Sequence, residues 1–381
     1  MKKILLMLLP LICVSFLMAS HLTPMELNSD ITINYGGEFV TRAIMNNDLG
    51  ENDGGWFDNR LQLNLEAKLA DRLGLAWTTE VGYITWTEYG NKYASIETRE
   101  LYLDYTTPCE MGKIRFGQQY WYDHRALVLD DYFSGITADL NFAGFTTELG
   151  FIKGYEGAIN KLDDAHVAFA NFIFKAPVDW GITAMFGQKH SQNEADIWVI
   201  PYFMLDFEPL TFDLTAVVNH QMFKDALGED DSEMGIAFAA KADVDMGLKL
   251  GLDLLYVTKE GICTLSPYYE NGLYLFGNKL AYDGVQIDDV IYAPYEAGED
   301  AYMSIVGKFG YPVSEKMDVC AAFGMVSRGD PIGTEFNIGM NYKVLDKLTF
   351  NPVLAIGMPG EDYWGTDSMI YMLGGLLKAE F

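Results

Sequence analysis

Basic residues are scarce in this chain of 381 residues. It carries 54 Asp and Glu against 26 Lys and Arg, and only seven of the basic residues are arginine. The formal net charge is −28 at pH 7. An acidic excess of this size repels polyanions, so the composition argues against nucleic acid as a partner.

Cysteine is scarce as well. Of the four cysteines, Cys13 lies in an N-terminal apolar run, which leaves Cys109, Cys263 and Cys320 in the rest of the chain. An odd number of widely spaced cysteines does not build a disulfide framework in an oxidising compartment. We therefore expect three isolated thiols without a functional role.

Apolar runs of helix length are lacking after the first twenty residues. Lys2 and Lys3 precede an apolar run at residues 4–18, and the small residues Ala19 and Ser20 follow it. This pattern predicts a secretory signal peptide over residues 1–20, too short for a bilayer-spanning helix. Its removal leaves 24 bases against 54 acids, a net charge of −30. We expect export from the cytoplasm without a helical anchor.

Alternation of apolar and polar residues is the main pattern that is present. In residues 60–69, RLQLNLEAKL, every second residue is apolar and the others are charged or amides. The segments 196–207, 210–218, 247–257 and 334–344 follow the same rule. Successive side chains of a strand point to opposite faces, so each segment predicts a strand with one apolar and one polar face.

Strand length and spacing predict a transmembrane barrel. Soluble strands usually have about five or six residues, whereas runs of about ten recur along this chain. Short connections such as 71–72 and 208–209 alternate with long ones such as 45–57, 122–132, 259–300 and 328–333. The count predicts an all-β, antiparallel, up-and-down barrel of about 18 strands over residues 21–381 as a single domain. Two false strands would give sixteen, and an extra hairpin near 268–292 would give twenty.

The last strand, at residues 369–381, ends in an aromatic residue on its apolar face. Tyr371, Leu373, Leu377 and Phe381 share one face, and Lys378 lies on the other. This ending resembles the closing strand of bacterial outer-membrane β-barrels, which the barrel-assembly machinery recognises. The resemblance implies residence in the outer membrane of a diderm bacterium, in contact with its lipid and lipopolysaccharide.

The segment 113–145 resembles the alginate-export type of outer-membrane porin. It contains a Gly-Gln-Gln-Tyr run, then Asp123, His124 and Arg125, and a following strand with Asp139. The resemblance implies an 18-stranded porin. A pore for polyuronates needs an arginine-rich constriction, and here Gln118 stands where that group has arginine. We therefore expect the architecture and the porin role, but not alginate as the solute.

The polar strand faces predict the lining of an aqueous pore, because a barrel of this width is too large for side chains to fill. Many of these charges are expected to pair across strands. Acids outnumber bases, so we expect passive diffusion of small hydrophilic solutes with a mild preference for cations or neutral sugars. The predicted pore-lining residues are Arg42, Arg60, Lys68, Glu80, Glu100, Asp104, Arg115, Asp139, Glu148, Asp206, Lys249, Asp253, Lys308, Glu335 and Lys343.

The longest predicted loop, residues 259–300, is rich in tyrosine. One hypothesis is that it enters the lumen and offers aromatic faces from Tyr268, Tyr269, Tyr274 and Tyr282 to sugar rings. The alternative is an external cap over the rim. The acidic loop clusters, Glu229-Asp230-Asp231 and Glu299-Asp300, could hold Ca²⁺ but match no EF-hand spacing, so neither a metal nor a cofactor is expected.

Motifs of hydrolytic enzymes are lacking too. The chain has neither G-x-S-x-G nor H-E-x-x-H, and an outer-membrane lipase would have to use His220 beside Asn219. We therefore predict no enzyme. The main alternative to a channel is a non-conducting barrel that serves adhesion or envelope integrity.

Overall fold

The computed structural model describes residues 31–47, 54–85, 95–108, 111–155, 165–175, 178–189, 194–224, 230–277, 295–361 and 368–381. The predicted signal peptide at 1–20 and Tyr282 lie outside these ranges. No helix in the described part of the chain is both long and apolar enough to cross a membrane.

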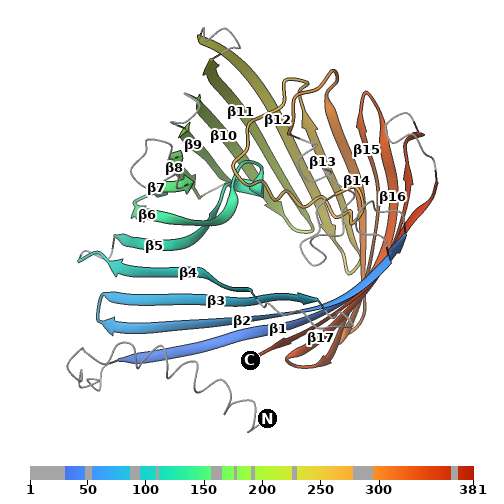
Figure 1. Ribbon diagram of the computed structural model, residues 1–381, viewed down its shortest axis with the longest axis horizontal. Coiled ribbons are helices and arrows are strands. Elements are labelled where there is room, and N and C mark those ends of the chain that lie inside the picture. Colours follow the sequence, from blue (N-terminus) through green and yellow to red (C-terminus); the bar gives the residue numbers. More distant parts are fainter. Residues whose placement is uncertain are drawn as a thin grey trace.

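Eighteen antiparallel strands form one sheet that closes on itself, because β1 pairs with both β2 and β18 (Figure 1). A closed sheet has no unpaired edge, which is what a β-structure needs in lipid. The strands are β1 (Thr32–Asn47), β2 (Gly54–Ala70), β3 (Leu73–Thr85), β4 (Ser95–Thr106), β5 (Gly112–Tyr122), β6 (Asp130–Phe142), β7 (Phe145–Tyr155), β8 (Ala165–Phe174), β9 (Asp179–Lys189), β10 (Glu194–Phe207), β11 (Leu210–Lys224), β12 (Asp230–Asp245), β13 (Lys249–Val257), β14 (Tyr302–Ser314), β15 (Met317–Arg328), β16 (Asp330–Leu345), β17 (Leu348–Pro359) and β18 (Ile370–Glu380).

The alternation in the sequence sorts side chains between an outer apolar surface and the lumen. In β2, Leu65 and Leu69 are 37% and 38% exposed on the outer face, while Arg60 points inward and forms an ion pair with Glu38 of β1. Large apolar side chains are exposed on most strands in the same way. In water such a surface would be costly, whereas a lipid environment accommodates it.

The closing strand has the two neighbours expected from the sequence, β17 and β1. Tyr371 and Leu373 are exposed on its outer face, and Lys378 on the inner face forms an ion pair with Glu38 at 2.7 Å. The backbone of Phe381 exchanges two hydrogen bonds with that of Gly37, each of 3.1 Å. The last residue is therefore paired with the first strand.

Some predicted connections were wrong. Residues 328–333 were expected to form a long loop, but Gly329 alone joins β15 to β16, and its φ of 66° suits a tight glycine turn. The loop expected at 122–132 is shorter, because β6 begins at Asp130. The described part of 259–300 contains no additional hairpin, so the strand count stays at eighteen.

Candidate functional site

Two loops from distant parts of the barrel meet inside it (Figure 1). The β5–β6 loop (residues 123–129) includes the 3-10 turn η2 (His124–Ala126), and the β13–β14 loop (residues 258–301) is described at 258–277 and 295–301. Six strands separate them on one side of the barrel and eight on the other. Their junction therefore forms a bar across the lumen.

The bar is joined by backbone hydrogen bonds. Leu265 N–H donates to the Val128 carbonyl at 2.9 Å, and Asp130 N–H donates to the Ser266 carbonyl at 2.7 Å. Tyr268 N–H donates to the Ala126 carbonyl at 2.9 Å. Each loop thus satisfies backbone groups of the other in a place where the barrel wall is out of reach.

The tip of the β5–β6 hairpin leaves the barrel wall. β5 pairs with β4 only as far as Gln118, and β6 pairs with β7 only from Ser134 onward. Beyond these points, residues 119–122 and 130–133 pair only with each other. The last part of the hairpin is therefore released from both neighbours and can extend into the lumen.

A pair of glycines marks the point of departure. Gly117 lies opposite Gly135, and its φ of 132° is in the region that favours glycine. A side chain on Gly117 would collide with the backbone of Leu101. Past this bend, Trp121 stacks on Phe169 of β8, with ring centroids 4.0 Å apart. One face of the tip thus packs on the inner wall.

Asp123 holds the β5–β6 loop in shape. Its carboxylate accepts backbone hydrogen bonds from Leu127, Val128 and Leu129 at 3.1, 2.9 and 2.5 Å. The side chain is buried, with the residue 1% exposed. Burial raises the pKa of Asp123 to about 6, against the opposing effect of the three N–H donors. The carboxyl thus supplies an acceptor to three backbone N–H groups that would otherwise have no hydrogen-bond partner.

Glu335 of β16 does the same for the β13–β14 loop. It is 1% exposed and accepts hydrogen bonds from the backbone N–H groups of Tyr274, Leu275 and Phe276 at 2.8, 2.9 and 3.1 Å. Leu275 and Phe276 are completely buried against the inner wall. A wall carboxylate and apolar packing together fix the loop inside the barrel.

A buried charged cluster connects both loops to β13 and β14. Arg125 donates to Asp253 at 2.8 Å, Lys308 lies 3.2 Å from the same carboxylate, and Tyr269 donates its hydroxyl to it. The Arg125 guanidinium lies over the Tyr269 ring at 4.9 Å. Asp253 is 1% exposed, and two cations and a hydroxyl satisfy it. Burial raises the pKa of Tyr269 well above its usual value, so its hydroxyl stays protonated.

A row of alternating charges lines the inner wall of β18 and β1–β4. The arginines are shared between carboxylates, so none presents an uncompensated charge to the lumen. The pairs in order along the wall are Lys378–Glu38 (2.7 Å), Arg60–Glu38, Arg60–Glu80 (3.7 Å), Arg99–Glu80 (2.8 Å) and Arg99–Glu97 (3.3 Å).

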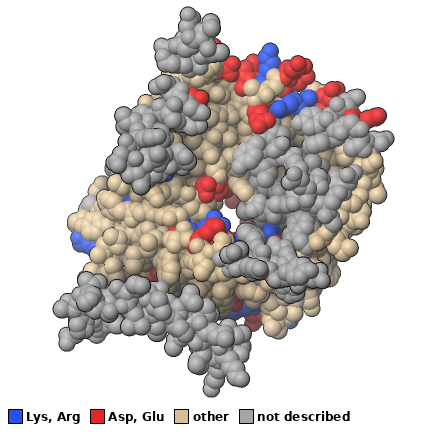
Figure 2. All heavy atoms as spheres, viewed as in Figure 1, with Lys and Arg blue, Asp and Glu red and all other residues tan. Residues whose placement is uncertain are grey.

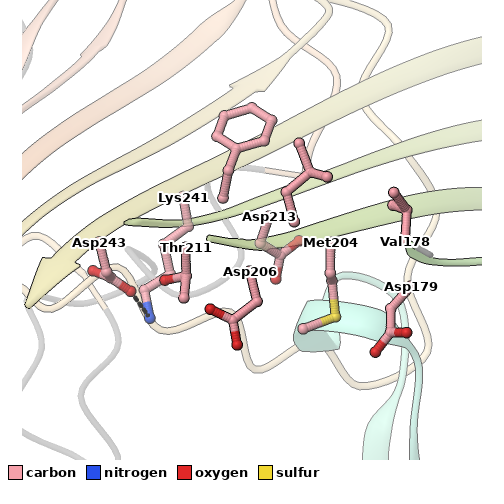
Figure 3. Close-up of a pocket in the computed structure, with 10 residues that line it drawn as sticks. Val178, Asp179, Met204, Asp206, Thr211, Asp213, Lys241 and Asp243 are labelled. Atoms are coloured by element: carbon pink, nitrogen blue, oxygen red, sulfur yellow. Dashed lines mark ion pairs between the residues drawn. The ribbon is translucent and has the colours of Figure 1, made fainter. Parts of the chain in front are cut away.

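An acidic hollow of about 370 Å³ lies on the inner wall of β9–β12, beside the turns that join these strands (Figure 3). Asp243 pairs with Lys241 at 2.8 Å, and the Asp213 carboxylate accepts a hydrogen bond from Nε2 of His124 in the β5–β6 loop at 2.9 Å. Asp179 and Asp206 are exposed, and their carboxylates make no hydrogen bond or ion pair with another described residue. The hollow therefore carries a negative field.

The predicted pore-lining residues divide into three groups. The first group forms ion pairs on the inner wall and comprises Arg42, Arg60, Glu80, Asp104, Arg115 and Asp139. Within it, Arg42 is buried together with its partner Asp58 at 2.7 Å. Three others, Asp253, Lys308 and Glu335, bind or adjoin the loops instead of facing open lumen. The remaining ones are placed as follows: Glu148 accepts from Trp121 and Asn171, Glu100 accepts from Thr78, Lys68 pairs with Asp71, Asp206 lines the acidic hollow, and Lys249 and Lys343 are exposed near strand ends.

Two of the expected aromatic faces of the long loop, those of Tyr269 and Tyr274, are not offered to a solute. Tyr269 and Tyr274 are 6% and 8% exposed, because they are packed between the loop and the wall. Tyr268 is half-buried. For Tyr269 and Tyr274 the expectation was wrong, because tyrosines that anchor a loop inside a barrel cannot also remain accessible.

The two residues considered for a lipase do not share a site. Asn219 is buried on the inner face, where it accepts a hydrogen bond from the Cys263 backbone N–H at 2.8 Å. His220 is the next residue of β11 and points to the opposite face. Asn219 is thus another anchor of the β13–β14 loop.

Sequence reasoning missed the loop anchors Asp123 and Arg125 and the wall residues Arg99 and Glu97. Asp123 and Arg125 were visible only as part of a motif. Asp123 accepts from backbone N–H groups four to six residues ahead, whereas the partners of Arg125 lie 128 and 144 residues away in the sequence. Arg99 is the extra residue of β4 at a register shift opposite Thr78 and Thr79 of β3, which shifts the inward positions of β4 and defeats simple alternation. No group of residues suited to hold a metal ion occurs in the described part.

No family model matches the sequence, and no curated protein matches it either. The fold, in contrast, is similar to solved structures of Pseudomonas aeruginosa outer-membrane proteins. OccK5 (OpdH) superposes with a TM-score of 0.63 at 9% identity, covering 92% of this chain and 98% of that chain. OccK1 (OpdK) superposes with a TM-score of 0.59 at 12% identity, covering 91% of this chain and 98% of that chain. OccK8 (OprE) superposes with a TM-score of 0.59 at 10% identity, covering 92% of this chain and 98% of that chain.

These similarities define the class of fold, a closed 18-stranded barrel of the outer-membrane porin type. More narrowly, the structural neighbours are porins of the Occ type. The expected similarity to alginate-export porins is not supported.

Proposed function

We propose that this protein is an outer-membrane channel for the passive diffusion of small hydrophilic solutes. The supporting observation is a barrel lumen crossed by a fixed bar of two loops, with an inner wall of charged side chains beside it. An opening is visible through the molecule in Figure 2, and acidic and basic side chains gather at its edge. A bar of this kind narrows a wide barrel to the size of small solutes.

The charges of the lumen favour cations and neutral solutes over anions. Arg60 and Arg99 are each bonded to two carboxylates, so an entering anion would have to compete with carboxylates already in place. Asp179 and Asp206 add unpaired negative charge at the hollow. The balance of fixed charges along a pore sets the local concentration of mobile ions.

Liposome swelling tests the proposal. Purified, refolded protein is inserted into liposomes, which are then diluted into isotonic solutions of neutral sugars of increasing size. We expect swelling that is fast for a pentose and slower for a disaccharide. Liposomes with heat-unfolded protein serve as the control. A swelling rate equal to that control for every sugar would instead support a non-conducting structural barrel.

A further inference from the structure

Three tyrosines and an aspartate form one exposed face at the tip of the inward hairpin. Tyr120 pairs with Tyr132 and Tyr122 pairs with Asp130, so the four side chains lie on the same side of the β5–β6 ladder. The Tyr120 ring centroid is 5.2 Å from that of Tyr132 and 5.6 Å from that of Tyr122. Tyr120 and Tyr122 are 39% and 55% exposed. We call these four residues the tyrosine face.

The tyrosine face looks into the lumen. Lower in the hairpin the same side carries Phe116 and Ile136, which are exposed toward lipid. Above the glycine bend the side becomes polar, as expected once the hairpin has left the wall. The guanidinium of Arg99, which is ion-paired with Glu80 on the inner wall, lies over the Tyr132 ring at 5.6 Å. The inner wall of β3 and β4 therefore lies across from this face.

The chemistry of the tyrosine face suits a cation. An aromatic ring attracts cations to its π-face, and Arg99 already occupies such a position at Tyr132. The Asp130 carboxylate accepts a hydrogen bond from the Tyr120 hydroxyl and makes no ion pair with any described Lys or Arg. Glu270 of the β13–β14 loop adds a second negative charge nearby. Exposed aromatic rings next to an uncompensated carboxylate are the arrangement that recognises quaternary ammonium groups.

We propose that the tyrosine face is a binding position for organic ammonium ions that cross the channel. This rests on the proposed channel function and narrows its solute class. Tyr120 and Tyr122 supply the ring faces, and Asp130 supplies the counter-charge. The cation remains partly hydrated, so binding is weak enough to allow release.

Block of the potassium current by choline tests the site in planar bilayers. The matched probe is 3,3-dimethylbutan-1-ol, which has the shape of choline without its charge. We expect choline to reduce the current through the wild-type channel in a saturable way, and the alcohol to do so only at much higher concentration. Replacing both rings, Tyr120→Leu with Tyr122→Leu, should weaken the block by roughly tenfold, the size of cation–π effects at partly exposed sites. Asp130→Asn should weaken it too, whereas Tyr120→Phe should retain it.

Tyr256→Leu is the matched control, since Tyr256 is 41% exposed on the outer face of β13 and should leave the block unchanged. Line broadening of the choline N-methyl NMR signal on detergent-solubilised protein measures binding without conduction. Broadening that is lost in the double leucine variant supports the site even if no channels are seen, a result that would reject only the proposed function. Equal block by the neutral alcohol, or unchanged block and broadening in the leucine variant, would overturn the ammonium site.

Discussion

Removing the Glu335 carboxylate should release residues 271–277 of the β13–β14 loop from the barrel wall. In Glu335→Ala, the backbone N–H groups of Tyr274, Leu275 and Phe276 lose their common acceptor. Three hydrogen bonds to a charged group contribute roughly 3–6 kcal/mol when their incomplete additivity is allowed for. The free energy lost with these hydrogen bonds is larger than the free energy that any exposed ion pair on the inner wall contributes.

Apolar packing does not hold the segment by itself. Leu273, Leu275 and Phe276 are completely buried, and burying three such side chains contributes about 5–9 kcal/mol. Ordering the backbone of residues 271–277 costs about 7–14 kcal/mol. Apolar packing alone therefore roughly balances the entropy cost, and the Glu335 hydrogen bonds decide in favour of the docked loop. We expect the docked state to become a minority in the variant.

Single-channel recording in planar bilayers measures the consequence. A released loop widens the passage, so the conductance of Glu335→Ala should exceed that of the wild type, with more frequent changes of level. Asp318→Ala is the matched control, because Asp318 is an exposed inner-face carboxylate on β15 whose removal changes the charge equally. Heat-modifiable mobility on gels verifies that both variants fold. Conductance and noise equal to those of the wild type in a folded Glu335→Ala barrel would refute the assignment of Glu335 as the loop anchor.

Four further outcomes follow from the same contacts. Gly117→Ala should lower the yield of folded barrel on gels, because its φ of 132° and the nearby backbone leave no room for a side chain; a wild-type yield would count against the bend. The raised pKa of Asp123, about 6 against a usual 3.8, means that the docked loop holds its proton more tightly than a released one. Docking of the β5–β6 loop should therefore be most favoured below pH 3.8 and lose this contribution as pH rises to about 6, so level changes should increase from pH 4 to pH 7 in the wild type and not in Asp123→Asn. Asp179→Asn with Asp206→Asn should lower the potassium-over-chloride permeability ratio, measured by reversal potentials, without closing the channel. Deleting Phe381 should reduce membrane insertion in cells more than it changes the conductance of the channels that do form; normal insertion would contradict its role in closing the barrel.

The strands could be predicted from the sequence because lipid and water impose alternation on every one of them. The segment 60–69 predicted its own inner and outer faces, and the short connection at 71–72 is a two-residue turn in the structure. The closing strand and its two neighbours followed from the same pattern. Local periodicity carries this information because each strand must satisfy the same two environments.

The interior could not be predicted in the same way. The contacts of Glu335 with residues 274–276 join segments about sixty residues apart, and no local pattern distinguishes this carboxylate from one that faces water. The inward bend depends on Gly117 lying opposite Gly135, which requires the register of the hairpin.

The reversal potential under a KCl gradient tests the central claim most directly. Purified protein is inserted into a planar bilayer with a tenfold gradient, and the potential at zero current is read for single insertions. The lumen charges predict open channels whose reversal potential has the sign of potassium selectivity, well short of the ideal potassium value. A bilayer that shows no channels with verified, folded protein would contradict the channel function, and a reversal potential of chloride sign would contradict the assignment of the paired arginines.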